Sequence, residues 1–261
     1  MRIVAVMAIL SGCLITASAQ APATEPDAAF AVATIKPSDP YSTGKGTRIR
    51  ERRFATVNTT LGYLIQYAYG FHPRQIVDAP KWLDEEKFDI VAIPEGQATP
   101  TNDEWKAMVR RLLTDRFALR FHDGTRILPV YLLVQKPAAR VTRSAGNVTV
   151  PDLTFRRGEG VIRLPAKNAT MDEFAHVMQR NVLDRPVIDR TGLIGRFDFT
   201  LIFTPSEYQI AMTGGGMRPA TDNPPPELFT ALEQQLGLKL QPAKAAIQVI
   251  EIDHVAEPSM N

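Results

Sequence analysis

Hydrophobic and polar residues alternate along several short stretches of the chain, and this period of two predicts β-strands. The clearest stretches are 30–35, 88–93 and 196–203. Elsewhere the apolar residues recur every three or four positions, which is the spacing of a helix that buries one face. Four main helices are predicted on this basis, at 61–69, after a capping box at 101–104, from 170 to about 183, and from 226 to 237.

The stretch from Asn168 to Glu173 joins the end of a strand to the start of a helix. Thr170 and Glu173 have the T-x-x-E spacing of a capping box, in which each side chain satisfies a backbone amide that the helix leaves unpaired. The earlier stretch Asn58-Thr59-Thr60 repeats this pattern at a shift of 110 (168 − 58). Residues of similar character recur at the same shift of 110 in the pairs Leu61/Met171, Leu64/Phe174, Ala68/Met178, Val77/Val187 and Leu83/Leu193.

A second alignment relates the ends of the two halves. Leu119-Arg120-Phe121 matches Leu238-Lys239-Leu240 at a shift of 119 (238 − 119), and 130–134 falls on 249–253. The larger shift reflects a longer Gly-, Pro- and Thr-rich loop at 204–223. We therefore interpret the chain as one unit written twice: a first α+β unit at 30–136, a linker at 137–147 and a second α+β unit at 148–258.

The end of each unit decides the expected fold class. Asp123-Gly124 is a turn signal between two apolar stretches, so a tight hairpin is predicted over 117–135. Helices and strands interleave, but hairpins of this kind favour antiparallel pairing. The prediction is an α+β fold of two tandem related units, each a mostly antiparallel sheet with two main helices.

The N-terminus has the features of an export signal. Arg2 precedes the apolar run 3–10, and Ala17-Ser18-Ala19 is a cleavage motif, so a signal peptide is predicted at 1–19 and a spacer at 20–29. The apolar run is too short to span a bilayer, and no transmembrane segment is expected in the mature chain. The expected location is extracytoplasmic, either periplasmic or secreted.

Cys13, the only cysteine, allows another interpretation of this segment. Leu10-Ser11-Gly12-Cys13 has the form of a lipobox, which would make Cys13 a lipid anchor. Apolar residues continue past Cys13, and we favour plain secretion. Cleavage after Ala19 would leave a chain without disulfides or thiolate ligands.

A resemblance to a known family is carried by segments throughout the chain. They are 30–38, 53–58, Leu61, 68–69, 80–83, 88–90, 115–131, 187–198, 235–240 and 252–259. Together they resemble exported proteins of unknown function that are often called soil-associated proteins. The resemblance implies export, and a domain also found as the outer tail of membrane metallopeptidases of the antibiotic-sensor type. The strand-Asn-x-Thr-helix unit is also similar to short periplasmic modules at the front of secretins and siderophore receptors. The chain departs from the family pattern at Ala31, where an acidic residue is usual, and at Gly124, where Glu is common.

Composition and motifs give little support to catalysis. The formal net charge is +2, which argues against a nucleic-acid partner. The histidines His72, His122, His176 and His254 show no metal-binding spacing, and no phosphate loop or nucleophile elbow is present. No metal, cofactor or catalytic residue is therefore predicted.

Two groups of residues are candidates for binding a ligand. Tyr63 and Tyr67 share one face of the first helix, Trp82 lies nearby in sequence, and the second unit has Glu173 and Val177 in place of the two tyrosines. Core packing is the alternative for these aromatic residues. Arg53 ends the basic stretch 45–53, which is either a contact for anionic polymers or the solvated side of an edge strand.

The turn at 189–195 supplies the last candidates, Arg190 and Thr191. They are either ligand contacts or parts of a strand connection in which Asp189 caps its own backbone.

These observations support two classes of function. The first is an exported, non-catalytic binding or assembly module of the cell envelope, whose partner is an unknown envelope protein, peptide or glycan. Its contact surface would be a groove between the halves or an exposed sheet edge. The alternative is a secreted hydrolase with a dispersed site that uses Asp198, His122 or His254. A weaker third possibility is the binding of anionic polymers through 45–53.

Overall fold

The computed structural model describes residues 28–42, 44–137, 139–146, 151–212 and 223–258. The predicted signal peptide, Cys13 and most of the spacer lie outside these residues. The strands are β1 (Phe30–Pro37), β2 (Gly46–Arg50), β3 (Arg53–Thr60), β4 (Ile76–Val77), β5 (Lys87–Pro94), β6 (Arg120–Gln135), β7 (Thr142–Arg143), β8 (Arg156–Gly158), β9 (Val161–Ala169), β10 (Val187–Arg190), β11 (Phe197–Phe203) and β12 (Leu238–His254). The helices are α1 (Leu61–Tyr69), η1 (Pro73–Gln75), α2 (Trp82–Glu85), α3 (Asn102–Phe117), α4 (Met171–Asn181), α5 (Glu207–Met212), α6 (Leu228–Ala231) and the π-helical turn η2 (Leu232–Leu236).

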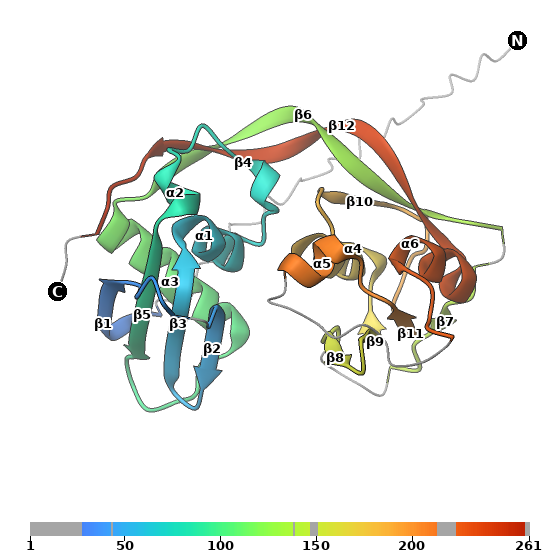
Figure 1. Ribbon diagram of the computed structural model, residues 1–261, viewed down its shortest axis with the longest axis horizontal. Coiled ribbons are helices and arrows are strands. Elements are labelled where there is room, and N and C mark those ends of the chain that lie inside the picture. The colour runs from blue at the N-terminus through green and yellow to red at the C-terminus, as the bar shows by residue number, and fades with distance from the viewer. Residues whose placement is uncertain (1–27, 43, 138, 147–150, 213–222, 259–261) are drawn as a thin grey trace, which may run out of the picture.

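The elements form two lobes, joined by a ribbon of two long strands (Figure 1). The first lobe contains β1–β5 and α1–α3, and its main sheet has the antiparallel order β1-β5-β3-β2. In the β5 sequence, alternate residues Phe88, Ile90 and Ala92 are buried, as the period-two pattern predicts. They pack against α1 and α3, which lie between the sheet and the ribbon.

The second lobe contains β7–β11, α4–α6 and η2. Its main sheet has the order β7-β11-β9-β8 and is also antiparallel. Phe174 of α4 is fully buried, and its ring meets that of Phe199 of β11 edge to face, with the centroids 5.1 Å apart. The α+β fold class is therefore confirmed, with mostly antiparallel sheets in both lobes.

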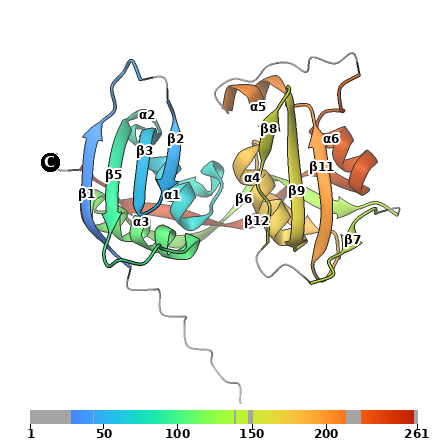
Figure 2. The ribbon, with the colours of Figure 1, turned by 90° about the horizontal axis from the view of Figure 1, so that it is seen from below.

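The predicted hairpin at Asp123-Gly124 is wrong. Residues 120–135 form the single strand β6, which pairs along its whole length with β12 and crosses from one lobe to the other (Figures 1 and 2). The short strands β4 and β10 add to this ribbon in parallel. The chain does not turn back at Gly124 because Val249 to Ile252 of β12 already occupy the place that the returning strand would take.

The two hydrophobic cores consequently mix distant parts of the chain. Tyr131 and Leu133 of β6 are buried in the core of the second lobe. Ile250 and Ile252 of β12 are buried in the core of the first lobe. Each core thus contains strand residues from the far side of the linker at 137–147, and part of that linker forms β7, which pairs with β11.

The helix starts follow the sequence signals. Thr60, Thr101 and Thr170 each accept a hydrogen bond from the third residue of the helix they precede. The boxes at Thr101 and Thr170 are reciprocal, because Glu104 and Glu173 bond back to the cap amide. α1 ends at Gly70, whose φ of 81° lies in the left-handed region that glycine adopts without strain.

Candidate binding surface

Among the described residues, β2 is one of the two edge strands of the first sheet, β1 being the other. It pairs with β3 on one side, from Gly46↔Val57 to Arg50↔Arg53, and it is the last strand in the sheet order. An edge strand presents free backbone N–H and C=O groups, which are a template for pairing with another strand. Of the four strands in this sheet, β2 is the nearest to the second lobe (Figures 1 and 2).

Arginines line one face of this edge. Arg48 and Arg50 are two residues apart and therefore point to the same side of β2, and Arg53 lies directly opposite Arg50 on β3. All three side chains are exposed. Like charges directly opposite each other on neighbouring strands are destabilising, so the pair Arg50/Arg53 is unfavourable unless an anion neutralises it. This row of Arg48, Arg50 and Arg53, together with the open edge of β2, is called the β2 surface below.

Two tyrosines flank the same edge on the core side of the sheet. The Thr47 hydroxyl of β2 donates to the Tyr63 hydroxyl at 3.4 Å, and the ring of Tyr67 lies 5.7 Å from that of buried Phe54. Burial raises the pKa of Tyr67 to about 12; the nearby Tyr63 acts in the same direction and Arg180 of the second lobe opposes it. Tyr67 is therefore neutral at physiological pH, and both tyrosines are half-buried rather than free platforms.

The second lobe has a corresponding edge. β8 is the last strand of its sheet, and Arg156 of β8 lies directly opposite Arg163 of β9. Arg163 is the residue that the shift of 110 assigns to Arg53 (163 − 53). Arg156 also has an acidic neighbour, because its guanidinium lies 3.6 Å from the carboxylate of Asp152. The opposed arginine pair therefore occurs on both sheets, and it is partly neutralised on the second.

The remaining predicted site residues lie elsewhere. Trp82 is half-buried on α2 and packs against the core of the first lobe. Arg190 is exposed at the end of β10 in the second lobe, and Thr191 is 6% exposed there. The backbone amide of Thr191 donates to Asp189 at 2.8 Å, and the Thr191 hydroxyl accepts from the amide of Leu193 at 3.1 Å. The contacts of Thr191 are those of a turn that caps its own backbone.

The structure therefore brings Arg53, Tyr63 and Tyr67 to the two sides of β2 and leaves the other three candidates apart. Sequence reasoning noted the basic stretch 45–53 but did not select Arg48 and Arg50. Their spacing of two within a strand was the available signal. Arg163 was also missed, although the repeat shift pointed to it.

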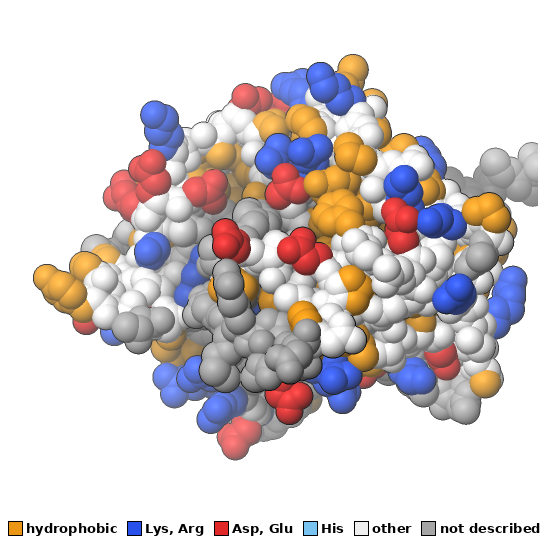
Figure 3. All heavy atoms as spheres, turned by 45° about the vertical axis from the view of Figure 1, so that its right-hand side comes forward, with side chains coloured by type: hydrophobic (Ala, Val, Ile, Leu, Met, Phe, Trp, Pro, Cys, Tyr) orange, Lys and Arg blue, Asp and Glu red, His pale blue; other side chains and the backbone are white. Residues whose placement is uncertain are grey.

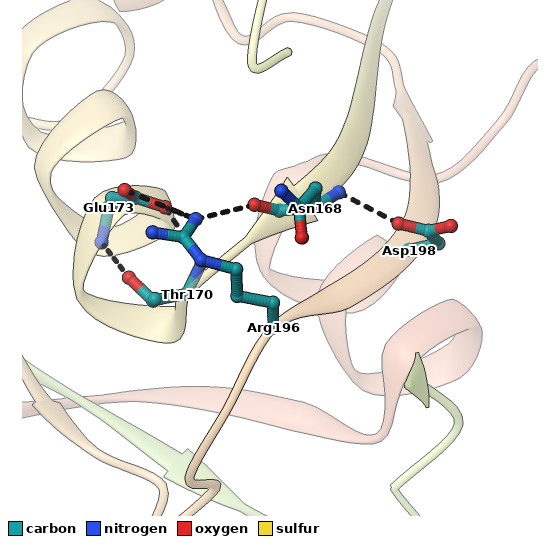
Figure 4. Close-up of polar contacts among 5 residues, drawn as sticks. All are labelled: Asn168, Thr170, Glu173, Arg196 and Asp198. Carbon is teal, nitrogen blue, oxygen red and sulfur yellow. Dashed lines mark hydrogen bonds and ion pairs between the residues drawn. The ribbon is translucent and has the colours of Figure 1, made fainter. Parts of the chain in front are cut away.

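Asp198, one of the three residues considered for hydrolysis, has a structural role. Its carboxylate accepts the backbone amide of Asn168 at 2.8 Å (Figure 4). This hydrogen bond, with a further one from Ser144, holds the pKa of the Asp198 carboxyl below its usual value. The corner around it also includes Arg196, which donates to the Asn168 carbonyl at 2.6 Å and to Glu173 at 3.2 Å. Asp198 is thus committed to holding the backbone.

His122 belongs to a polar cluster on the exposed ribbon. Its Nδ1 lies 2.8 Å from Asp253 and its Nε2 lies 3.6 Å from Glu251. Arg126 in turn lies 2.9 Å from Glu251 and 3.6 Å from Asp78. His254, the residue after Asp253, is exposed.

No group of three or more His, Cys, Asp or Glu side chains among the described residues could hold a metal ion. No helix in the described part of the chain is long and apolar enough to cross a membrane. On the face shown in Figure 3, basic and acidic side chains are interspersed with small apolar groups.

Comparison with known proteins places the chain in a family. Residues 62–255, from the second residue of α1 to just past the end of β12, match the family described as "Protein of unknown function (DUF3738)". The chain belongs to the DUF3738 family. No curated protein and no solved structure matches it significantly. The DUF3738 match includes Tyr63, Tyr67 and the whole ribbon but begins after β2 and β3, so the β2 surface lies outside it.

Proposed function

We propose that the chain is an exported, non-catalytic binding module that takes up an extended, acidic segment of a partner protein along the edge of β2. The observation that carries this proposal is the open strand edge with exposed arginines at alternate positions of one face. Export is inferred from the predicted signal peptide at 1–19.

The geometry of strand addition explains why a polypeptide fits this edge. A segment that pairs with β2 would satisfy the free backbone groups, which supply affinity, while its alternate side chains supply specificity. Residues two apart on a strand are about 7 Å apart. An acidic residue at every second position of the added strand would therefore face Arg48 and Arg50 in turn. The same acids would neutralise the opposed pair of Arg50 and Arg53.

The binding test uses short labelled peptides. A fluorescein-labelled peptide of four Glu-Thr repeats should bind, as measured by anisotropy, and the affinity should fall as salt rises. A Lys-Thr peptide and a block peptide with four Glu followed by four Thr should bind more weakly. The variant Arg48→Glu/Arg50→Glu should lose at least about tenfold in affinity, since each charge-assisted contact contributes about 1.5–3 kcal/mol.

Arg190→Glu is the control on the second lobe, because it also replaces an exposed arginine by glutamate. Hydrogen exchange should show protection of amides 46–50 when the peptide is bound. Equal loss of binding in both variants, or no protection of β2, would contradict the proposal. Tighter binding of a sulfated oligosaccharide than of any peptide would instead indicate a glycan partner.

The alternative function, hydrolysis, rests on the contact between His122 and Asp253. A carboxylate that holds a histidine is the arrangement of a general base. If the chain is a hydrolase of this type, His122→Ala should abolish the release of nitrophenol from acetyl and butyryl nitrophenyl esters. Unchanged hydrolysis in His122→Ala, or none in the unmodified chain, would remove this alternative.

We also infer that the two lobes derive from one unit written twice. This inference is supported by the corners at Asn58 and Asn168, which lie 110 residues apart. Asn58 has a φ of 55° and Asn168 a φ of 49°, and each donates its amide to an aspartate on the neighbouring strand. These aspartates, Asp89 and Asp198, belong to the Phe-Asp pairs that the two halves have in common.

A further inference from the structure

The pairing of β6 with β12 has an internal symmetry. In the sequence, the residues that follow Leu119 match those that follow Leu238 at a shift of 119. In the ribbon, Ile127 lies directly opposite Ala246, and these two residues are 119 apart (246 − 127). Ile127 therefore faces its own counterpart, as a residue does on the twofold axis of a symmetric dimer.

The pairs on either side of this centre exchange with each other. Val130 faces Ala243, and Gly124 faces Val249. At the shift of 119, the counterpart of Val130 is Val249 and the counterpart of Gly124 is Ala243. The pair Val130/Ala243 therefore corresponds to the pair Val249/Gly124, with the two strands exchanged. Paired residues of an antiparallel ladder exchange in this way only when a residue at the centre of the ladder faces its own counterpart in the repeat.

The burial of side chains follows the same relation. Tyr131 and Leu133 are buried in the second lobe, and their counterparts Ile250 and Ile252 are buried in the first. At the contact between the lobes, Arg74 of the first lobe is 3.7 Å from Asp184 of the second, which is its counterpart at the shift of 110 (184 − 74). Corresponding residues thus meet each other across the lobe interface.

We propose that the ribbon is a strand-swap interface in which the last strand half of each repeat completes the core of the other repeat. The chain is then equivalent to a strand-swapped dimer whose two subunits have been joined by the linker. The proposal rests on the duplication inferred above and adds a partner to it: a second copy of either repeat can replace the other repeat across the ribbon.

The burial of side chains along the ribbon agrees with the swapped form. Ile127 at the centre is 73% exposed, so the middle of the ribbon contributes little burial. The strand halves at its two ends contribute the buried contacts, and each end lies in a different core.

The test starts from the full chain with a protease site in place of residues 147–150. After cleavage, the two fragments should stay together as a 1:1 complex in native mass spectrometry, because each core contains a strand half from the other fragment. Unfolding the cleaved protein in urea and diluting it should yield the 1:1 complex together with homodimers of each fragment. The uncut chain, treated in the same way, should return as a monomer.

One substitution distinguishes pairing through the ribbon from non-specific association. Leu133→Asp should remove the homodimer of the first fragment and leave that of the second, which carries Ile252 at the corresponding position. Separation of the fragments into monomers, or recovery of the 1:1 complex alone, would overturn the proposal. Binding of the Glu-Thr peptide to the cleaved protein is measured separately, so failure of the swap and failure of the β2 surface can be distinguished.

Discussion

The corner between β3 and α1 and the corner between β9 and α4 solve the same problem with partly different side chains. In both, an asparagine in the left-handed region lies at a shift of the strand register, and a threonine two residues later caps the helix. In the first lobe, Asp89 accepts the Asn58 amide at 3.0 Å and the Ser38 hydroxyl at 2.6 Å. In the second, Asp198 accepts the Asn168 amide and a hydrogen bond from Ser144.

The two corners differ at the third residue of the helix. Glu173 completes the capping box in the second lobe and forms an ion pair with Arg196. Tyr63 occupies this position in the first lobe, where it contacts Thr47 of the edge strand β2. The asparagine, threonine and aspartate hold the backbone in both lobes, which leaves the third position free. The second lobe uses this position for helix stability, and the first lobe uses it to flank the proposed binding surface.

The largest expected effect comes from destabilising the core of one lobe and monitoring the unfolding of the other. Phe174→Ala should destabilise the protein by about 3–5 kcal/mol, because it leaves a cavity in the second lobe. Both tryptophans, Trp82 and Trp105, lie in the first lobe, so their fluorescence monitors that lobe, whereas circular dichroism monitors both. We expect Phe174→Ala to lower the urea midpoints of both signals together, since the lobes share the ribbon.

Leu64→Ala is the matched change in the first lobe, with an expected loss of about 2–5 kcal/mol. If Phe174→Ala shifts the circular dichroism signal and leaves the fluorescence midpoint in place, the lobes unfold independently.

A second prediction concerns His72, at the contact between the lobes. The backbone amide of Arg74 donates to His72 Nδ1 at 3.2 Å, and Nε2 lies 3.4 Å from the Leu183 carbonyl, an arrangement that requires the neutral ring. Burial lowers the pKa of His72 to about 4 from 6.5; the Leu183 hydrogen bond and Asp184 act in the opposite direction, and Arg74 reinforces the shift.

The unfolded chain therefore binds a proton that the folded chain excludes between pH 6.5 and about 4. The stability from neutral His72 is present above pH 6.5 and is lost as the pH falls through this window, by up to roughly 3 kcal/mol. Urea unfolding at several pH values should show this loss. His72→Asn retains a capping acceptor without titrating, so a pH dependence as steep as before in this variant would contradict the assignment.

The helix caps provide a smaller and more direct comparison. Thr170→Ala and Thr60→Ala should each lower the free energy of unfolding by about 1 kcal/mol, because each removes the acceptor for a helix amide. We expect the larger loss at Thr170, where the reciprocal box is also broken. Thr→Ser at the same positions retains the hydroxyl and should be nearly neutral. A larger loss at Thr60 would mean that the two corners are not held in the same way.

The smallest expected effect on stability is at the side chains that differ between the two corners. Arg196→Ala should lower stability by about 0.5–1 kcal/mol at low salt and less at high salt, since Glu173 and Arg196 form a partly exposed ion pair. Tyr63→Phe in the first lobe removes only the long hydroxyl contact with Thr47 and should show no salt dependence. A salt-independent loss in Arg196→Ala would assign its role to the hydrogen bond with the Asn168 carbonyl instead.

The local elements were predictable because their signals are local. Thr101 and Glu104 mark the start of α3, and Gly70 marks the end of α1, through contacts within a few residues. The alternation in 88–93 identified β5 and its buried face. The hairpin at Asp123-Gly124 failed for the opposite reason: whether a strand turns or continues depends on Val249 and its neighbours, more than 100 residues away.

The candidate site was only partly predictable. The basic stretch containing Arg53 and the flanking Tyr63 and Tyr67 were identified from composition and from the difference between the halves. Trp82, Arg190 and Thr191 share no surface with them, because sequence proximity or a dense polar turn does not determine where a side chain lies in the fold. The contact between His122 and Asp253 likewise arises from the ribbon register and has no sequence signal of its own.

The sequence by itself determined the helix caps and the corners at Asn58 and Asn168. These depend on hydrogen bonds and side-chain periods that act within one turn or one strand. Only the tertiary structure decided that β6 and β12 continue across both lobes and that each core is closed by a distant strand. The partner of a strand depends on residues far away in the sequence, so local preferences cannot select it and the packing of the whole chain does.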